Sequence, residues 1–171
     1  MSQARNEPET AEVDRLLTAA ARVIAGVRYC WLVTEAGTGL NARPMGHLAA
    51  PNHEWNIRFV TDGRSRKASE MRRARKVALI FQSDQGDAYV ALNGRATLIE
   101  DEAEVRWLWK RAYDPYFPNE TDKANAAFVQ VGVERMELWI RGVTPEPFGL
   151  RATRLDRGSA GDWRLSDNMA A

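Results

Sequence analysis

The sequence contains very little cysteine and histidine, with one cysteine and two histidines in 171 residues. A single cysteine excludes a disulfide framework within the chain, and a reducing cytoplasm is the expected compartment. Because Cys30 lies inside an apolar run, we expect it to be a small buried side chain rather than a nucleophile. His47 and His53 have no cysteine or acidic partner at metal-ligand spacing, so no metal site is predicted.

Long apolar runs and an excess of one charge are also lacking. No stretch approaches the roughly 20 apolar residues of a membrane-spanning helix, and the polar residues 1–9 do not resemble a signal peptide. The 24 basic and 23 acidic residues leave a formal net charge of +1, which argues against binding to nucleic acid through bulk electrostatics. We therefore expect neither a membrane nor a nucleic-acid partner.

Several catalytic signatures are absent from the sequence. It contains no G-x-G-x-x-G fingerprint, no P-loop and no G-x-S-x-G nucleophile elbow. No nucleophile or acid–base pair is evident from the spacing of its side chains. These absences favour either a bound cofactor that carries the chemistry or a binding role without catalysis.

The hydrophobic pattern predicts one domain of short strands with three inserted helices. Helices are expected over 11–25 with Thr10 as its cap, after Ser65, and over 101–112. Alternating or continuous apolar runs predict strands over 29–35, 42–50, 55–61, 77–81, 89–99, 126–133, 136–141, 148–155 and 163–165. Asn93-Gly94 is either a hairpin turn or a bulge. The sum is a small, mostly antiparallel barrel over 10–165 with flanking helices, a flexible tail over 1–9 and a polar tail over 166–171.

The most unusual stretch is D-G-R-S-R-K, residues 62–67, where a strand ends and a helix begins. Ser65 stands at the N-cap position. Arg64, Arg66 and Lys67 add positive charge where the free N–H groups of the helix are already partly positive. Two interpretations remain open: the cations are solvated, or an anion is held there by N–H groups, the Ser65 hydroxyl and the basic side chains. Because the basic cluster over 64–76 is local, it suits a small anionic ligand better than a nucleic acid.

Several motifs, taken together and in order, resemble one known family. They are N-A-R-P-M (41–45), F-V-T-D-G-R-S-R-K (59–67) before a short helix and V-A-L-I-F, N-G-R-A (93–96), Y-F-P (116–118) and E-L-W (137–139). The chain resembles the pyridoxamine 5'-phosphate oxidase-like FMN-binding split-barrel superfamily, in particular its general stress protein 26 branch, over about residues 16–155. The resemblance implies a mainly β, six-stranded antiparallel split barrel that forms a homodimer with FMN at the subunit interface.

The resemblance also implies which residues contact the flavin. The phosphate and ribityl chain would be held by Arg43, Ser65, Arg66 and Lys67. The isoalloxazine ring would be lined by Pro44, Met45, Phe59, Val60 and Thr61, with Gln82 as a polar contact and Trp139 approaching from the partner subunit or closing the interface. Each assignment has a purely structural alternative, which is a solvated surface cation or a side chain of the packed core.

Two departures separate this chain from the vitamin B6 oxidases of the family. Those enzymes carry a lysine five residues after the first flavin arginine, where this chain has Leu48, and an arginine–histidine pair in the last strands, whereas no histidine follows His53. Oxidation of vitamin B6 phosphates is therefore not expected. The resemblance implies an FMN-binding redox protein or oxidoreductase with a small-molecule electron donor and acceptor. The alternatives are a non-catalytic flavin store or redox sensor, and a relative that binds FAD, the deazaflavin F420 or haem.

Overall fold

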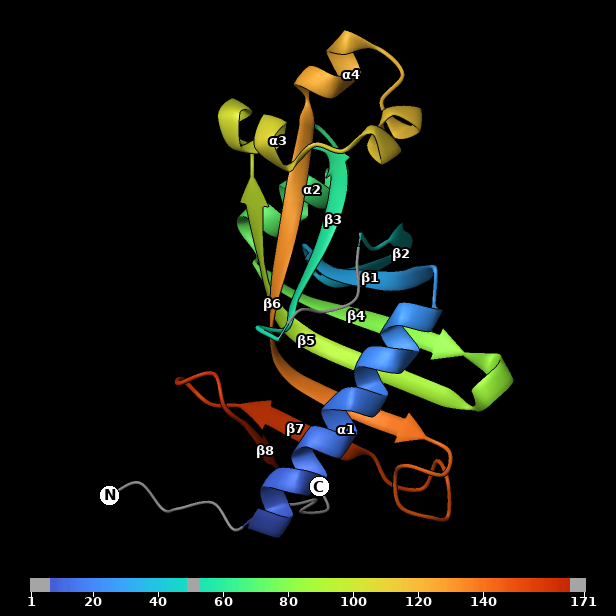
Figure 1. Ribbon diagram of the computed structural model, residues 1–171. Coiled ribbons are helices and arrows are strands. Elements are labelled where there is room, and N and C mark those ends of the chain that lie inside the picture. Colours follow the sequence, from blue (N-terminus) through green and yellow to red (C-terminus); the bar gives the residue numbers. More distant parts are fainter. Residues whose placement is uncertain (1–6, 49–52, 167–171) are drawn as a thin grey trace.

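A computed structural model describes residues 7–48 and 53–166 (Figure 1). The helices are α1 (Glu7–Gly26), α2 (Arg66–Arg73), α3 (Glu102–Leu108) and α4 (Glu120–Ala124), with 3-10 turns η1 (Asp84–Gly86) and η2 (Arg111–Tyr116). The strands are β1 (Tyr29–Ala36), β2 (Gly39–Gly46), β3 (Asn56–Asp62), β4 (Lys76–Ser83), β5 (Ala88–Ile99), β6 (Ala126–Ile140), β7 (Thr153–Arg157) and β8 (Trp163–Leu165). Among these described helices, none combines the length and apolar character needed to cross a lipid bilayer.

All strand pairs are antiparallel, and the two longest strands, β5 and β6, hold the sheet together. The order is β2-β1-β4-β5-β6-β7-β8, and β3 pairs with the first half of β6. The β5–β6 register shifts between Asn93 and Gly94, so the sequence N-G marks a β-bulge and not a hairpin turn. Beyond this bulge β6 leaves β7 and takes β3 as its second neighbour, which bends the sheet towards a barrel.

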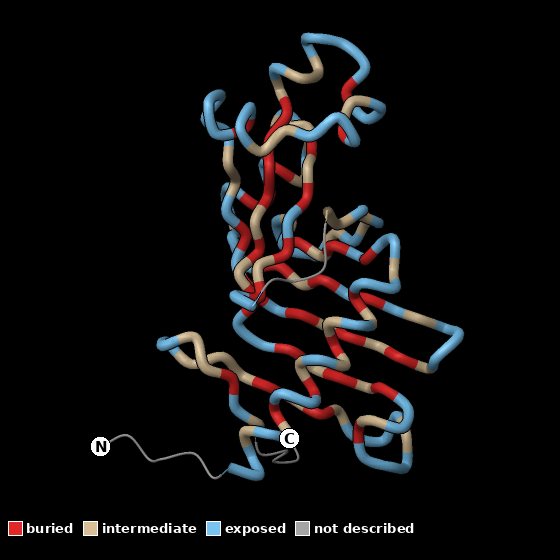
Figure 2. Tube along the Cα trace, in the orientation of Figure 1, coloured by how far each residue is buried: buried red, intermediate tan, exposed pale blue. Residues whose placement is uncertain are grey.

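The main core lies between α1 and the inner faces of the strands. Along α1 the buried residues are Val13, Leu16, Ala20 and Ile24, which form one stripe at helical spacing. Figure 1 shows α1 crossing the sheet over β4 and β5, and it packs on these two strands and on β8. Along the strands, buried and exposed residues alternate (Figure 2), as the period of two in the sequence predicts.

A second, smaller core lies under the segment 102–124, which joins β5 to β6. Val105 of α3, Tyr113 of η2 and Phe117 pack against Phe128 and Ala126 at the start of β6. In Figure 1 these short helices gather at the end of β3 and β6 that lies farthest from α1. Residues 113–125, which lie between the last predicted helix and the next predicted strand, therefore contain helical turns with an aromatic underside.

The mainly β class with flanking helices is confirmed, and the differences concern boundaries and strand count. Eight strands form the described sheet, where the resemblance implied six. Residues 126–140 form one continuous strand instead of two, and the strand predicted over 148–155 begins only at Thr153. The helix predicted over 101–112 ends at Leu108.

Two early boundaries also differ, for local reasons. Helix α1 begins at Glu7, four residues before the predicted start, because Pro8 fits a first helical turn and the acidic Glu7 and Glu9 complement the helix dipole. Strand β2 begins at Gly39, since Ala36 pairs with Gly39 across a two-residue turn whose Gly37 has φ +63°. The end predicted for that strand, Ala50, lies outside the described residues.

Candidate functional site

The link from β3 to α2 forms the capped helix start that the sequence predicted. Ser65 is the N-cap, and its hydroxyl accepts a hydrogen bond from the Ala68 N–H at 3.4 Å. The preceding turn is closed by the Ser65 N–H, which donates to the Asp62 carbonyl at 3.0 Å. The N-terminus of α2 is therefore held in place before any ligand is considered.

A cavity of about 480 Å³ opens beside this helix start, and we call it the β3–α2 cavity. Its wall combines one strand pair, the end of β3, the first turn of α2 and the segment before β6. The lining residues are Arg28, Tyr29, Met45, Gly46, Leu48, Val60, Thr61, Asp62, Lys67, Tyr116, Phe117 and Asp122. Four of the sequence-predicted site residues are among them, namely Met45, Val60, Thr61 and Lys67.

Lys67 is the cation that α2 presents to the cavity. Its pKa is lowered, mainly because burial removes water from the ammonium group and also because the positive Arg43 lies nearby, while Asp62 opposes the shift. A half-buried ammonium without full charge compensation favours an anionic partner. The electrostatics at Lys67 therefore agree with the anion-site interpretation of the helix start.

Thr61 belongs to the same wall, but its hydroxyl is turned away from the cavity. The side chain lies on the buried side of β3 together with Phe59, and the residue is only 4% exposed. Its Oγ1 atom has no hydrogen-bond partner within residues 7–48 and 53–166. Leaving such a group unpaired costs free energy, and most buried polar groups in proteins are paired.

Two other predicted phosphate contacts are engaged with a carboxylate of the protein itself. Arg43 Nη2 lies 2.7 Å from Glu70 Oε2, and Arg43 Nη1 donates to Thr34 Oγ1. Arg66 is largely exposed and lies 3.5 Å from the same carboxylate, measured from Nε to Oε1 of Glu70. Both arginines surround the start of α2, but neither lines the β3–α2 cavity.

The remaining predicted residues lie away from the cavity. Phe59 is fully buried in the main core, because it points to the opposite side of β3 from Val60. Gln82 is exposed and donates to Asp84 at 2.5 Å. In the sheet register Gln82 of β4 is paired with Tyr89 of β5, and Tyr89 is paired with Trp139 of β6. These three side chains therefore lie on the same side of the sheet.

That face continues towards the cavity through exposed aromatic and apolar residues. Trp31 is paired with Pro44 on β2 and with Ile80 on β4. Tyr29, two residues before Trp31, is 52% exposed and also lines the cavity. We call this surface the outer sheet face, and its members are Tyr29, Trp31, Pro44, Ile80, Gln82, Tyr89 and Trp139. The predicted site residues are thus distributed over the cavity, the outer sheet face, the start of α2 and the main core.

Residues of the segment 102–124 were missing from the predicted site. Tyr116 and Phe117 of the Y-F-P motif and Asp122 of α4 line the cavity opposite β2 and β3. The Y-F-P motif was a signal of the family, but the sequence predicted neither a helix nor a strand there. Leu48, the position at which vitamin B6 oxidases carry a lysine, is an apolar part of the same wall.

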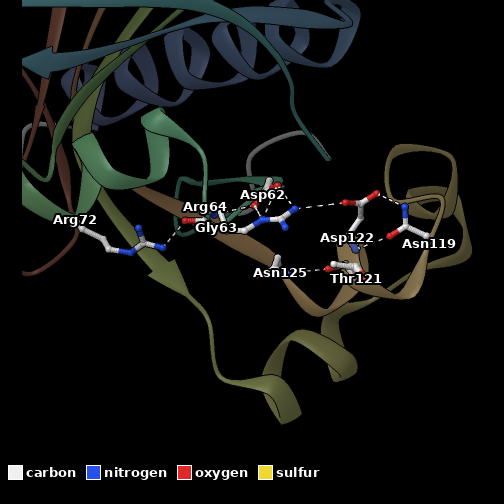
Figure 3. Close-up of polar contacts among 8 residues, drawn as sticks. All are labelled: Asp62, Gly63, Arg64, Arg72, Asn119, Thr121, Asp122 and Asn125. Atoms are coloured by element: carbon white, nitrogen blue, oxygen red, sulfur yellow. Dashed lines mark hydrogen bonds and ion pairs between the residues drawn. The ribbon is translucent and has the colours of Figure 1, made fainter.

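Arg64 has a different role from the neighbouring cations. Its guanidinium donates hydrogen bonds to both carboxylate oxygens of Asp62, and its Nη2 atom lies 3.4 Å from Oδ1 of Asp122 (Figure 3). Figure 3 also shows Arg72 reaching back to the Gly63 carbonyl, a contact of 2.6 Å. Arg64 therefore neutralises the two carboxylates at the rim of the cavity.

No group of three or more His, Cys, Asp or Glu side chains that could hold a metal ion occurs in the part of the chain that the structure describes.

The fold is shared with solved structures of low sequence identity. A Clostridium acetobutylicum protein related to general stress protein 26, of the pyridoxinephosphate oxidase family, has a TM-score of 0.69 at 17% identity, covering 84% of this chain and 95% of its own. A pyridoxamine 5'-phosphate oxidase-related, FMN-binding protein from Nostoc punctiforme PCC 73102 has a TM-score of 0.65 at 15% identity, covering 95% and 97%. An FAD-binding protein from Mesorhizobium loti has a TM-score of 0.55 at 15% identity, covering 70% and 90%.

The family follows from the sequence match. No curated protein sequence matches the chain at a significant level. The family model described as "Pyridoxamine 5'-phosphate oxidase like" matches residues 17–145, which is well over half of the chain and includes every lining residue of the β3–α2 cavity. The chain belongs to the pyridoxamine 5'-phosphate oxidase-like family.

Proposed function

We propose that this protein binds a flavin, most simply FMN, in the β3–α2 cavity and acts as a redox protein. The observation that carries the proposal is the half-buried Lys67, which lines the cavity at the capped start of α2 without a carboxylate ion-pair partner among the described residues. A dianionic phosphate would compensate this charge, and the apolar side chains of Met45 and Val60 in the same wall suit the ring. The general stress protein 26-like and FMN-binding structural neighbours support the same conclusion.

The residues of the cavity fit the two ends of such a cofactor. Lys67, Ser65 and the free N–H groups of α2 would hold the phosphate, with Arg66 approaching from the solvent side. Met45 and Val60 would cover the ring, beside the backbone of Thr61. When bound, the flavin supplies the transfer of two electrons, while the protein binds, orients and shields it.

Vitamin B6 phosphates are poor candidates for the substrate. The wall position taken by Leu48 offers an apolar side chain where a substrate phosphate would need a cation. The donor and acceptor of electrons are instead small molecules that need no such phosphate clamp. We infer a cytoplasmic setting, which agrees with the single reduced cysteine.

A second copy of the chain is the partner that we propose for the outer sheet face. Trp31, Tyr29 and Ile80 are 49%, 52% and 38% exposed there, an unusual amount of apolar surface for a sheet. The face reaches the cavity through Tyr29, so a copy that covered the face would also border the flavin. Gln82 and Trp139 would then contact the flavin of the other subunit.

A non-catalytic flavin store or redox sensor is the second candidate. Asp62, a carboxylate of the cavity, pairs with Arg64, whose hydrogen bonds hold the pKa of Asp62 below its ordinary value and disfavour it as a proton donor. FAD, the deazaflavin F420 and haem remain the alternative ligands, and the FAD-binding neighbour from Mesorhizobium loti is the reason to test FAD first.

The first experiment is a titration of the purified protein with FMN, FAD, F420 and haem, followed by absorbance and fluorescence. We expect binding of FMN, a loss of affinity of at least about tenfold in Lys67→Ala, and no change in Lys76→Ala, an exposed lysine outside the cavity. A protein that ignores all four ligands would overturn the proposal.

Two further measurements separate the candidates. Reduction of the bound flavin by NADH or NADPH with turnover of an acceptor supports an oxidoreductase, whereas a flavin that stays oxidised with both donors supports the store or sensor. Light scattering of the native protein and of Trp31→Glu tests the homodimer, because a charge on the outer sheet face should yield monomers.

A further inference from the structure

The most heavily bonded buried group outside the cavity is the carboxylate of Glu70 on α2. The residue is 5% exposed and accepts three hydrogen bonds from the β1–β2 hairpin. The donors are Thr34 Oγ1 at 2.7 Å, Asn41 Nδ2 at 2.5 Å and Arg43 Nη2 at 2.7 Å. The Thr34 hydroxyl also accepts from Arg43, so Thr34, Arg43 and Glu70 form a closed ring of contacts.

This ring joins two elements, β2 and α2, that both contribute to the wall of the β3–α2 cavity. Lys67 lies three residues before Glu70, on the same face of α2. Met45 lies two residues after Arg43, on the same side of β2. Any shift of Arg43 relative to Glu70 therefore changes the separation between Met45 and Lys67, which both line the cavity.

The ion pair between Arg43 and Glu70 is buried, so the free energy lost by removing both charges from water offsets much of their attraction. The Arg43 and Glu70 side chains are only 16% and 6% exposed. Burial by itself raises the pKa of Glu70, but the hydrogen bonds from Thr34, Asn41 and Arg43 outweigh it and hold the pKa below its ordinary value. The carboxylate is charged at neutral pH, and a well-packed apolar pair would be of similar or greater stability. Stability alone therefore does not explain why Arg43 and Glu70 are charged, and we look for a role in function.

We infer that Glu70 is a positioning residue of the flavin site, holding Arg43 and the β1–β2 hairpin against α2 so that the cavity has its binding shape before the ligand arrives. This inference rests on the proposed function. Glu70 touches no part of the cavity itself, and it acts through Arg43 as one unit. Preorganisation of this kind increases affinity by lowering the cost of ordering the site on binding.

A double-mutant cycle on FMN binding tests the unit directly. We compare the native protein, Glu70→Gln, Arg43→Met and the double variant, with Glu134→Gln as a control that breaks an exposed ion pair to Arg95 far from the cavity. Each single variant should bind FMN at least about tenfold more weakly, and the double variant no more weakly than the weaker single one. The control should bind like the native protein.

Hydrogen exchange of the ligand-free proteins provides a second readout that needs no flavin. Glu70→Gln should speed exchange across β2, while α1 and β5 keep their protection. Three results would each overturn the inference. The first is a loss of FMN affinity in the double variant equal to the product of the two single losses. The others are an unchanged FMN affinity of Glu70→Gln and a uniform loss of exchange protection over the whole chain. If the native protein binds no flavin, the proposed function fails, and faster exchange limited to β2 would still show the clamp by itself.

Discussion

Arg64 of the β3–α2 turn contacts Asp122 of α4 across 58 positions of the sequence, with 3.4 Å between Nη2 and Oδ1. The same guanidinium lies 2.7 Å from Asp62, so one cation bridges two carboxylates at the rim of the cavity. Of the three cations at the start of α2, Arg64 thus compensates carboxylates of the protein itself. This separates it from Lys67, which has no carboxylate within ion-pair distance among the described residues.

This difference predicts unequal effects of two charge-removing variants. Arg64→Gln should change FMN affinity by less than about threefold, because the lost charge compensated Asp62 and Asp122, whereas Lys67→Ala should cost at least about tenfold. A fluorescence titration of FMN with both variants measures the contrast. Equal losses would mean that Arg64 leaves its carboxylates and contacts the ligand.

Thr61→Val should stabilise the ligand-free protein and leave FMN affinity nearly unchanged. The substitution keeps the shape and removes a buried hydroxyl that has no partner in the described structure, so the ligand-free protein should gain up to about 1 kcal/mol. FMN affinity should change by less than about threefold, because the hydroxyl lies on the buried side of β3 and does not face the cavity. Urea unfolding without flavin and calorimetry with FMN measure the two effects. A clear loss of affinity would mean that the hydroxyl turns towards the ligand.

The predictable part of the site was the part determined by local sequence. Ser65 as N-cap and Lys67 in the next turn follow from the spacing around one turn, and the strand alternation places Val60 on the side of β3 opposite to Phe59. The fate of Arg43 was not predictable in this way. Its partner Glu70 is 27 residues away, and only the pairing of β1 with β2 and the packing of α2 on β1 bring them together.

The cavity wall from the segment 102–124 was missed for a related reason. Tyr116 and Phe117 stand between two prolines, a pattern typical of a loop, and the sequence gives no periodicity that fixes their direction. The direction of Phe117 is set by an aromatic cluster with partners elsewhere in the chain. Trp109 contacts Phe117 with 5.3 Å between ring centroids, and Tyr113 contacts Phe128 at 5.8 Å. Such tertiary packing is not encoded in any short window.

Gly94→Ala should be strongly destabilising, and Gly132→Ala should not. A Cβ atom on Gly94 would lie 2.2 Å from the Gly132 carbonyl oxygen, so the backbone of the bulge would have to move. On Gly132 the nearest atom, Oδ1 of Asn56, is 3.6 Å away, an ordinary contact. We expect a loss of about 2 kcal/mol or more for the first and under about 1 kcal/mol for the second. Urea unfolding of both variants checks the pair, and similar values would argue against a crowded bulge.

The thiol of Cys30 should be inert in the native protein. The residue is 2% exposed, and burial raises the pKa of its thiol to about 12, so almost no thiolate exists at neutral pH. Ellman's reagent should react with less than one thiol per chain over hours in buffer and with one after unfolding in guanidinium. Rapid reaction of the folded protein would show that β1 opens locally.

The free energy that separates the native protein from Glu70→Gln should decrease on acidification. The pKa of Glu70 is held below its ordinary value of 4.5 by the hydrogen bonds that outweigh its burial. Above pH 4.5 both the folded and the unfolded chain carry the charged carboxylate, and the stabilisation by Arg43 is complete. As the pH falls further, the unfolded chain takes up the proton first, and the stabilisation disappears once the pH passes below the pKa of Glu70 in the folded protein.

Urea unfolding at pH 7 and at several values below pH 4.5 measures this effect. The difference in unfolding free energy between the two proteins should shrink steadily, because the other titrating carboxylates are common to both. A difference that stays constant with pH would mean that the ionised form of Glu70 contributes nothing to the clamp.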